Sequence, residues 1–273
     1  MFDFSCPVCG GVLIREGASL KCAGAHSFDI SKYGYVNLLL SNKSSKKRHG
    51  DDKTMARSRS EFLERGWYKP LLDYLCEKLA GFSGDGDRIL DAGCGECWYT
   101  ANIYRFLKES SVNTCFGAVD ISKDALSIGA RREKDIFCAV AGVYSLPVAD
   151  GCCRTVLNIF APCAASEFKR VLCADGMLVR AVPLERHLMG LKEAVYENAY
   201  ENEPEGLELE GFTISDVTRI EYALTLESAN DIDALFKMTP YYYKTSRADQ
   251  QRLSGLSRLE TEIAFCVVSY IKK

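Results

Sequence analysis

The sequence lacks several features that mark membrane-bound, secreted and strongly basic proteins. No run approaches the roughly 20 apolar residues that a membrane-spanning helix needs. The first residues, MFDFSCPVCGG, have neither the basic nor the apolar region of a signal peptide. Positive charge is not in excess, because the formal net charge is −3, and this argues against a purely electrostatic nucleic-acid binder. We therefore expect a cytoplasmic protein that does not associate with membranes.

The chain also lacks the pattern of a disulfide framework, internal repeats and long low-complexity tracts. Its 13 cysteines are an odd number and are scattered over the whole length. Several lie in apolar runs, such as Cys138 in IFCAV and Cys266 in AFCVV, which is typical of buried, reduced cysteine in a cytosolic protein. A chain of 273 residues, 47% of them hydrophobic, predicts one large domain with something smaller beside it.

Four potential metal ligands stand near the start of the chain, with the spacing C-x2-C-x12-C-x3-H. They are Cys6, Cys9, Cys22 and His26. A Cys3His set is a standard structural zinc site, and the 12 intervening residues suffice for a hairpin that returns the second pair of ligands. The alternative is a redox motif or incidental cysteines, but Gly10-Gly11 does not begin the helix that a redox CxxC needs. Because four protein ligands fill the coordination shell, we expect a structural ion.

Strands and helices alternate from Arg88 onward, after a helical stretch at 55–80. Strands are expected at 88–92, 114–120, 136–141, 154–160 and 177–183, with helices at 97–108, 122–131 and 165–172 between them. This order predicts a Rossmann-like α/β fold, with a mostly parallel sheet covered by helices on both faces. Two late strands, 213–226 and 260–271, flank helical segments at 229–237 and 247–255. They complete a seven-stranded sheet that ends in an antiparallel pair.

A glycine turn of the form D-x-G-x-G follows the first of these strands. Asp91 precedes Gly93 and Gly95, and Asp120 ends the next strand, where a carboxylate can bond ribose hydroxyls. A dinucleotide site would need a third glycine where this chain has Trp98. The negative charge of Asp91 suits a cofactor with a sulfonium and an ammonium group. The turn therefore favours S-adenosylmethionine over a dinucleotide or a structural turn without a ligand.

Longer segments resemble the RlmA family, the large-subunit ribosomal RNA guanine-N1 methyltransferases, over nearly the whole chain. They include FSCPVCGGVL, FDISKYGYVNLL, RSRSEFLERGWYKPL, ILDAGCGECWYT, NIFAPC, PLERHLMGLK and KMTPYYY. The resemblance implies a small N-terminal zinc-ribbon module (1–36), a basic linker (37–60) and a class I methyltransferase domain (61–273). It also implies a hairpin of 23S ribosomal RNA as the partner, and makes a homodimer possible.

The resemblance further implies which residues contact the cofactor. Its motifs carry this role over to Tyr68, Tyr99, Thr100 and His187, beside the Asp91–Gly95 turn and Asp120. One departure stands out, because the family usually has a third glycine where this chain has Cys97. If the backbone there needs a positive φ, we expect cofactor binding to weaken.

The substrate side is expected at the end of the fourth strand of the parallel sheet. Methylation of guanine N1 requires an unpaired or flipped base, on which aromatic side chains can stack. Asn158 and Phe160 are our candidates for guanine contact, although core packing explains Phe160 equally well. For Tyr241–Tyr243 a buried strand is favoured over a place in the cleft. The basic segment Lys43–Arg59 either grips phosphates or is a solvated linker.

Three functions therefore stay open at this stage. The first is methylation of guanine N1 in 23S ribosomal RNA. The second is a methyltransferase acting on a small molecule or a protein, which would leave the zinc module and the basic linker without a task. The third is a non-catalytic RNA-binding relative, suggested by Cys97. The modified guanine and the base that deprotonates N1 stay undetermined.

Overall fold

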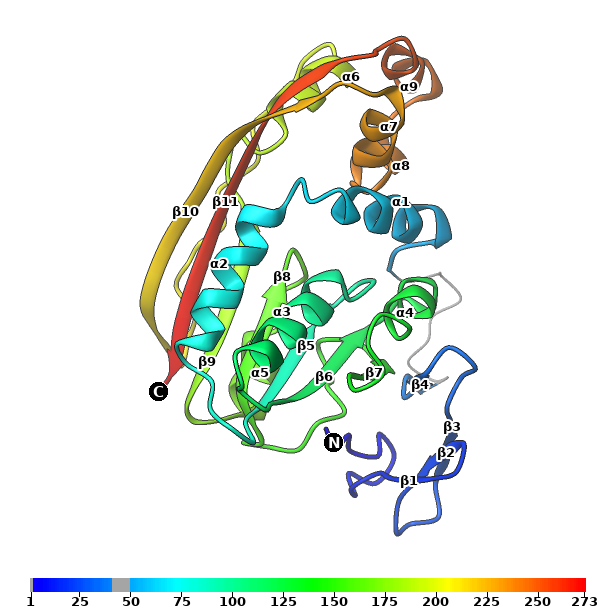
Figure 1. The fold of residues 1–273 in the computed structure, drawn as a ribbon, viewed down its shortest axis with the longest axis vertical. Coiled ribbons are helices and arrows are strands. Elements are labelled where there is room, and N and C mark those ends of the chain that lie inside the picture. The colour runs from blue at the N-terminus through cyan, green and yellow to red at the C-terminus, as the bar shows by residue number, and fades with distance from the viewer. Residues whose placement is uncertain (1, 41–49) are drawn as a thin grey trace.

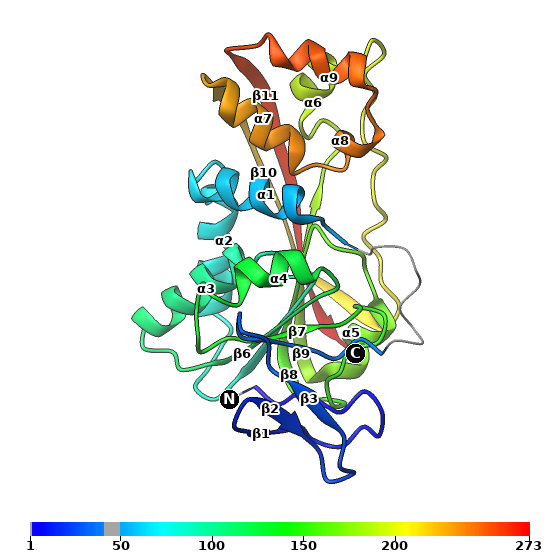
Figure 2. The ribbon, with the colours of Figure 1, turned by 90° about the vertical axis from the view of Figure 1, so that its right-hand side faces the viewer.

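An eight-stranded sheet forms the centre of the protein in the computed structural model, which describes residues 2–40 and 50–273 (Figures 1 and 2). The strand order is β10-β11-β9-β8-β5-β6-β7-β4. Neighbours from β4 to β9 run parallel, whereas β11 is antiparallel to both β9 and β10. The strands are β4 (Tyr35–Asn37), β5 (Arg88–Ala92), β6 (Cys115–Asp120), β7 (Phe137–Val140), β8 (Cys153–Ile159), β9 (Leu172–Pro183), β10 (Phe212–Leu226) and β11 (Leu259–Lys272). The predicted seven strands and their antiparallel end are confirmed, and β4 adds an eighth strand at the edge.

The helices cover both faces of this sheet because its central strands are apolar on both sides, as parallel strands usually are. They are α1 (Lys53–Glu64), α2 (Lys69–Ala80), α3 (Trp98–Glu109), α4 (Lys123–Gly129), α5 (Ala165–Val171), α6 (Met189–Val195), α7 (Ala229–Lys237), α8 (Tyr241–Lys244) and α9 (Arg247–Ser254). The protein has two hydrophobic cores, one on each face of the sheet, and alternate side chains of β5 belong to different cores. Ile89 packs in the cluster that contains α2 and α3, and Leu90 in the cluster that contains α5.

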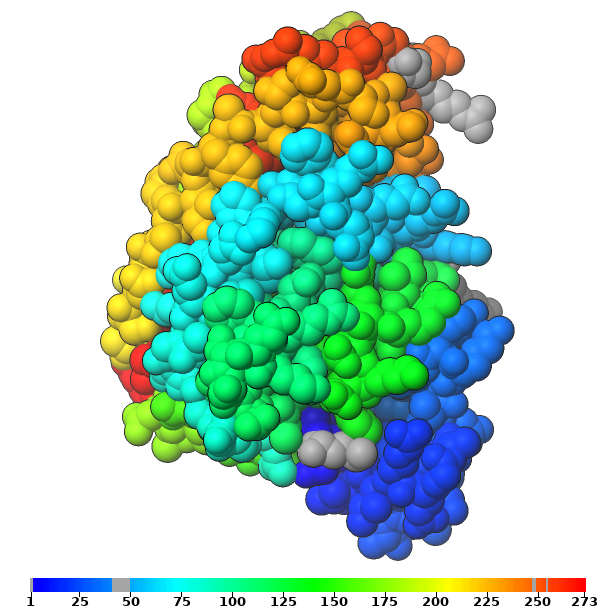
Figure 3. Space-filling model, in the orientation of Figure 1, coloured from blue at the N-terminus to red at the C-terminus, as the bar shows by residue number. Residues whose placement is uncertain are grey.

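The N-terminal segment packs directly on the sheet. Its strands β1 (Ile14–Glu16), β2 (Ser19–Lys21) and β3 (Ser27–Asp29) form a small antiparallel sheet, and Figure 3 shows this segment in blue against the larger body. Phe2 and Phe4 are buried in the same core as Leu90. A Cβ at Gly117 would lie 2.6 Å from the Phe2 ring, so glycine is required for this close approach. The predicted boundary after residue 36 falls inside β4, which joins the main sheet beside β7.

The helical stretch expected at 55–80 is two helices, α1 and α2. Gly66 separates them with a φ of +79°, and Pro70 stands in the first turn of α2, where its missing N–H costs nothing. Asp52 caps α1 by accepting a hydrogen bond from the Met55 amide at 2.9 Å. Part of the predicted basic linker therefore belongs to α1, and residues 41–49 of that linker lie outside the described residues.

The antiparallel pair β10 and β11 is long and carries α6 to α9 near one end (Figure 1). The expectation of a strand at Tyr241–Tyr243 is wrong, since these residues form helix α8. The short α6 and α8 were not expected from periodicity, because each has only about one or two turns. None of the helices in the described ranges has the length and apolar character needed to cross a membrane.

Candidate functional site

A cavity of about 760 Å³ opens at the carboxyl ends of the parallel strands. From β5 the chain adds β6 and β7 toward one edge of the sheet, and it then returns to add β8 and β9 on the opposite side of β5. The order of the strands therefore reverses beside β5. Ligands of open α/β sheets bind at such a reversal of strand order. Seven predicted site residues line this cavity together with Phe160: Tyr68, Asp91, Gly93, Gly95, Tyr99, Asp120 and His187.

The glycine turn is shaped for close approach of the backbone to a ligand. Gly93 has a φ of +95°, and a Cβ at this position would lie 2.3 Å from the Cβ of Ala161. Its amide donates to the Val119 carbonyl of β6 at 2.8 Å. Only glycine meets both the conformational and the steric requirement.

Cys97 ends this turn with a φ of +59°, in the left-handed region, and precedes α3. A non-glycine residue there costs about 1–2 kcal/mol. With a positive φ at Cys97, weaker cofactor binding stays the expectation.

Asp91 places a buried carboxyl group at the base of the turn. Its Oδ2 accepts a hydrogen bond from the Thr100 hydroxyl at 2.6 Å, whereas its Oδ1 has no partner among the described residues. Burial raises the pKa of this carboxyl to about 8, and the Thr100 hydrogen bond opposes the rise. Thr100 is itself fully buried, so it supports Asp91 rather than lining the cavity.

Asp120, at the end of the neighbouring strand β6, is hydrogen-bonded to the glycine turn. Its Oδ2 accepts from the Gly95 amide at 2.9 Å and its Oδ1 from the Ser122 amide at 2.7 Å. Burial raises its pKa to about 6, against these two backbone hydrogen bonds. Each carboxylate oxygen can accept a second hydrogen bond, so Asp120 can also accept hydrogen bonds from the hydroxyl groups of a ligand.

Tyr68 and His187 form a pair whose proton positions follow from their contacts. His187 Nδ1 accepts from the Ala264 amide at 3.3 Å, and burial lowers the pKa of His187 to about 3, helped by nearby Lys192. The neutral ring therefore carries its proton on Nε2, which lies 3.4 Å from the Tyr68 hydroxyl. The oxygen of the Tyr68 hydroxyl accepts a hydrogen bond from this Nε2–H group. The hydroxyl proton of Tyr68 can therefore be donated to a ligand in the cavity.

Phe160 directly follows the carboxyl end of β8 and lines the cavity. It is 41% exposed, and its φ of +53° is a strained value for a bulky side chain. Its ring lies 5.0 Å from that of Phe265, 6.4 Å from Tyr68 and 6.5 Å from Tyr99, measured between centroids. Strain of this kind persists where surrounding structure enforces it and clusters at functional sites. The alternative of plain core packing fits poorly with this exposure.

Asn158 does not line the cavity and is 1% exposed. Its Nδ2 donates to the carbonyls of Ala92 and Pro162 at 3.0 and 3.2 Å, and its Oδ1 accepts from Arg180 at 3.2 Å. These contacts leave its amide poorly placed to touch a base, so it holds the cofactor turn and the loop after β8 together.

Several cavity residues were missed by sequence reasoning because only the folded chain brings them there. They are Asp51, Arg59, Asn202, Glu205 and Tyr241. Two of them carried a signal. Arg59 belongs to the basic segment for which phosphate contact was one interpretation, and a place in the cleft was the less favoured interpretation of Tyr241.

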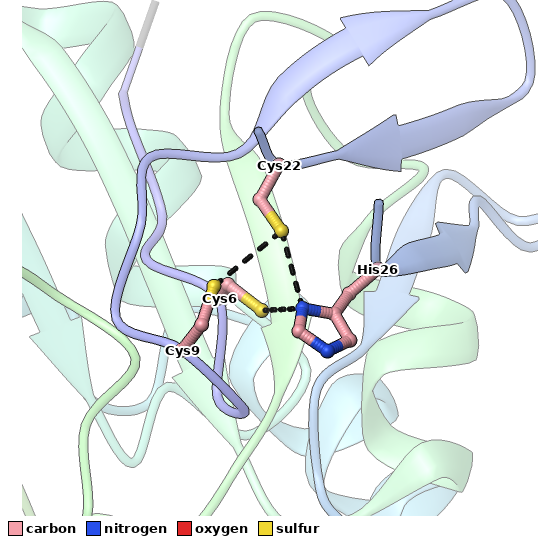
Figure 4. Close-up of side chains that lie close together, drawn as sticks. All are labelled: Cys6, Cys9, Cys22 and His26. Carbon is pink, nitrogen blue, oxygen red and sulfur yellow. Dashed lines mark hydrogen bonds between the residues drawn. The ribbon is translucent and has the colours of Figure 1, made fainter. Parts of the chain in front are cut away.

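The four predicted metal ligands converge at one point of the N-terminal segment (Figure 4). The Sγ atoms of Cys9 and Cys22 are 3.5 Å apart. His26 Nδ1 lies 3.6 Å from Cys6 Sγ and 3.3 Å from Cys22 Sγ. Zinc bond lengths give tetrahedron edges of about 3.5–3.8 Å, so the cluster has the size that zinc requires. All 13 cysteines are free of disulfide bonds, as expected.

The fold and the site together define a class I methyltransferase-type α/β protein that carries an N-terminal zinc ribbon. Comparison with known proteins narrows this class. Residues 4–46 match the zinc-ribbon family model described as RlmA, N-terminal.

Three relatives extend this similarity beyond the zinc ribbon. YxjB of Bacillus subtilis, to which 23S rRNA (guanine-N1)-methyltransferase activity is ascribed, is 32% identical over 94% of this chain and 92% of its own. A Micromonospora griseorubida protein with the same ascribed activity is 36% identical over 68% of this chain and 67% of its own. The 23S rRNA (guanine(748)-N1)-methyltransferase of Streptomyces fradiae is 32% identical over 70% of this chain and 66% of its own. The chain therefore belongs to the RlmA family.

Proposed function

We propose that this protein transfers a methyl group from S-adenosylmethionine to N1 of a guanine in a hairpin of 23S ribosomal RNA. The observation that carries the proposal is the shared cavity. The Asp91 carboxyl group, whose Oδ1 has no partner among the described residues, faces the same space as an exposed, strained aromatic ring. Membership of the RlmA family supports the reaction and the RNA substrate.

The residues present fit S-adenosylmethionine, which when bound supplies an electrophilic methyl group. Asp91 Oδ1 is the buried acceptor that a ligand ammonium group would satisfy. Asp120 is the acceptor for ribose hydroxyls, and the Tyr68 hydroxyl is a donor held by His187. The Tyr99 hydroxyl, which has no partner within residues 2–40 and 50–273, supplies a further polar contact in the same wall of the cavity.

The residues on the other side fit a purine base. Phe160 offers a ring face for stacking, which is how proteins commonly hold a base that has left its helix. Its neighbours Tyr68, Tyr99 and Phe265 pack around the ring and hold it in place. We assign Phe160 to guanine contact and Asn158 to positioning of the loop that carries it.

We assign the zinc ribbon to RNA recognition, with Cys6, Cys9, Cys22 and His26 holding a structural zinc ion. A segment this short cannot build a sufficient hydrophobic core, so the metal fixes its shape. The division into module (1–36), linker (37–60) and methyltransferase domain (61–273), the cytoplasmic location and a homodimer belong to the proposal as well.

The test is methylation of 23S ribosomal RNA that lacks the modification. The purified, zinc-loaded protein is incubated with the RNA and S-adenosylmethionine, and the RNA is digested to nucleosides for mass spectrometry. We expect 1-methylguanosine to appear. Cofactor binding without methylated RNA would favour a small-molecule or protein substrate. Absence of cofactor binding would favour a non-catalytic RNA-binding relative.

A further inference from the structure

The cavity has one acidic residue away from the cofactor side. The acidic residues that line it, within the described part of the chain, are Asp51, Asp91, Glu96, Asp120 and Glu205. Asp91 and Asp120 belong to the ends of β5 and β6, and Glu96 to the turn between β5 and α3. Asp51 is paired with Arg59, and its carbonyl accepts from Ser122 just after β6. Glu205 is tied instead to β9, on the substrate side of the strand reversal.

A buried arginine fixes Glu205 in this place. Arg180 of β9 is 2% exposed, and its Nη2 donates to Glu205 Oε1 at 2.7 Å. Its Nε donates to Asn158 Oδ1 at 3.2 Å. A buried charge is costly unless it is paired, and the Glu205 carboxylate is the charge that pairs it. Glu205 itself is 45% exposed, and its Oε2 has no hydrogen-bond partner among the described residues.

The same chain of contacts reaches both halves of the reaction site. Asn158 links Arg180 to the Ala92 carbonyl, directly before the cofactor turn, and to the Pro162 carbonyl, two residues after Phe160. The network therefore fixes the position of Glu205 relative to the cofactor turn and to the loop that carries Phe160. A carboxylate held in this way matches the guanine pairing edge, where N1–H and the 2-amino group are adjacent donors.

We propose that Glu205, held by Arg180 and Asn158, binds the pairing edge of the target guanine and accepts the N1 proton during methyl transfer. The inference rests on the proposed function. Guanine N1 forms its new bond to the methyl carbon, and the broken sulfur–methyl bond leaves its electron pair on sulfur. The N1 proton passes to the Glu205 carboxylate, and the exposure of Glu205 lets the proton leave to water. Arg180 and Asn158 are positioning residues.

The groups around Glu205 on other elements do not compete for this proton. They are Arg180 of β9, Cys163 of the loop after β8 and Tyr270 of β11. Burial raises the pKa of both Cys163 and Tyr270, so neither carries a negative charge at neutral pH. The carboxylate of Glu205 is therefore the available proton acceptor among them.

The test compares E205Q with wild-type protein in single-turnover methylation of 23S ribosomal RNA across a range of pH. The glutamine keeps the size and can still accept from Arg180, but it cannot take a proton. We expect the rate near neutral pH to fall by about 10²–10⁴-fold, the usual contribution of a general base. Cofactor affinity should stay within about twofold of wild type, because Asp91 and Asp120 are untouched. The deficit should shrink at high pH, where hydroxide takes over removal of the N1 proton.

The matched control is Glu201→Gln, four residues earlier in the same segment. Glu201 is exposed, pairs with Arg186 and is outside the cavity lining, so its loss should leave the rate unchanged. E205D should recover part of the E205Q deficit. An E205Q rate within about threefold of wild type would overturn the inference, as would a deficit that is constant with pH. If wild-type protein itself methylates no guanine, the proposed function fails first and the inference falls with it.

Discussion

Replacing Asp91 by asparagine should change cofactor affinity and protein stability in opposite directions. The amide oxygen can still accept from Thr100, whose hydroxyl is 2.6 Å from the carboxylate. The negative charge for a ligand ammonium group is lost. A hydrogen bond to a charged group contributes about 1.5–3 kcal/mol, which corresponds to a loss of roughly 10- to 150-fold in affinity.

The stability of D91N should rise because the wild-type carboxyl is penalised by burial. Its pKa is about 8 in the folded protein, against about 3.9 in an unfolded chain. The folded state therefore binds a proton that the unfolded state has lost between these values, so wild-type stability falls as pH rises from 4 to 8. D91N lacks this dependence, and its advantage in melting temperature should grow over the same range.

The assay is calorimetric titration with S-adenosylmethionine beside thermal unfolding without ligand, each at several pH values. Wild-type affinity should increase as pH rises toward 8, because binding the ammonium group requires the ionised carboxyl. D91N affinity should be flat with pH. The control is Asp73→Asn on α2, an exposed residue paired with Lys69, which should alter neither quantity. Unchanged affinity together with a lower melting temperature in D91N would refute the assignment of Asp91.

Two further predictions concern the metal and the glycine turn. Cys9→Ser should lower zinc content and the melting temperature of the N-terminal segment, because one of four ligands is lost. Metal analysis checks this prediction, with Cys173→Ser as the control. Equal zinc content in both variants would contradict it. Gly93→Ala should destabilise the protein by several kcal/mol and abolish cofactor binding, because its Cβ would lie 2.3 Å from that of Ala161 at a φ of +95°. Thermal unfolding decides this, and a stability equal to wild type would show that the turn is not confined as described.

Much of the fold follows from local patterns that survive folding unchanged. The alternation of apolar strands and amphipathic helices predicts β5 to β9, and the cysteine spacing predicts the metal cluster, because both depend on short-range geometry. Periodicity could not separate α1 from α2, since the break depends on the positive φ of Gly66. It also missed β4, whose three residues form a strand only because β7 offers an edge.

The site was predictable where it lies on the glycine turn and not where it depends on distant segments. Asp91, Gly93 and Gly95 are close in sequence, so a motif finds them. Glu205 comes from a loop, and no local pattern indicates its cavity position. Asn158 was chosen as a base contact from its position after β8, but its side chain turns to Ala92, Pro162 and Arg180. Side-chain direction depends on tertiary packing.

Primer extension on 23S ribosomal RNA tests the central claim most directly. A methyl group on N1 blocks the pairing edge of guanine, so reverse transcriptase should stop one nucleotide before the modified base. RNA treated with wild-type protein and S-adenosylmethionine should show one new stop, which should weaken strongly with D91N. A protein that binds the cofactor, yet leaves the pattern of stops unchanged on unmodified RNA, would contradict the assignment of guanine N1 as the methyl acceptor.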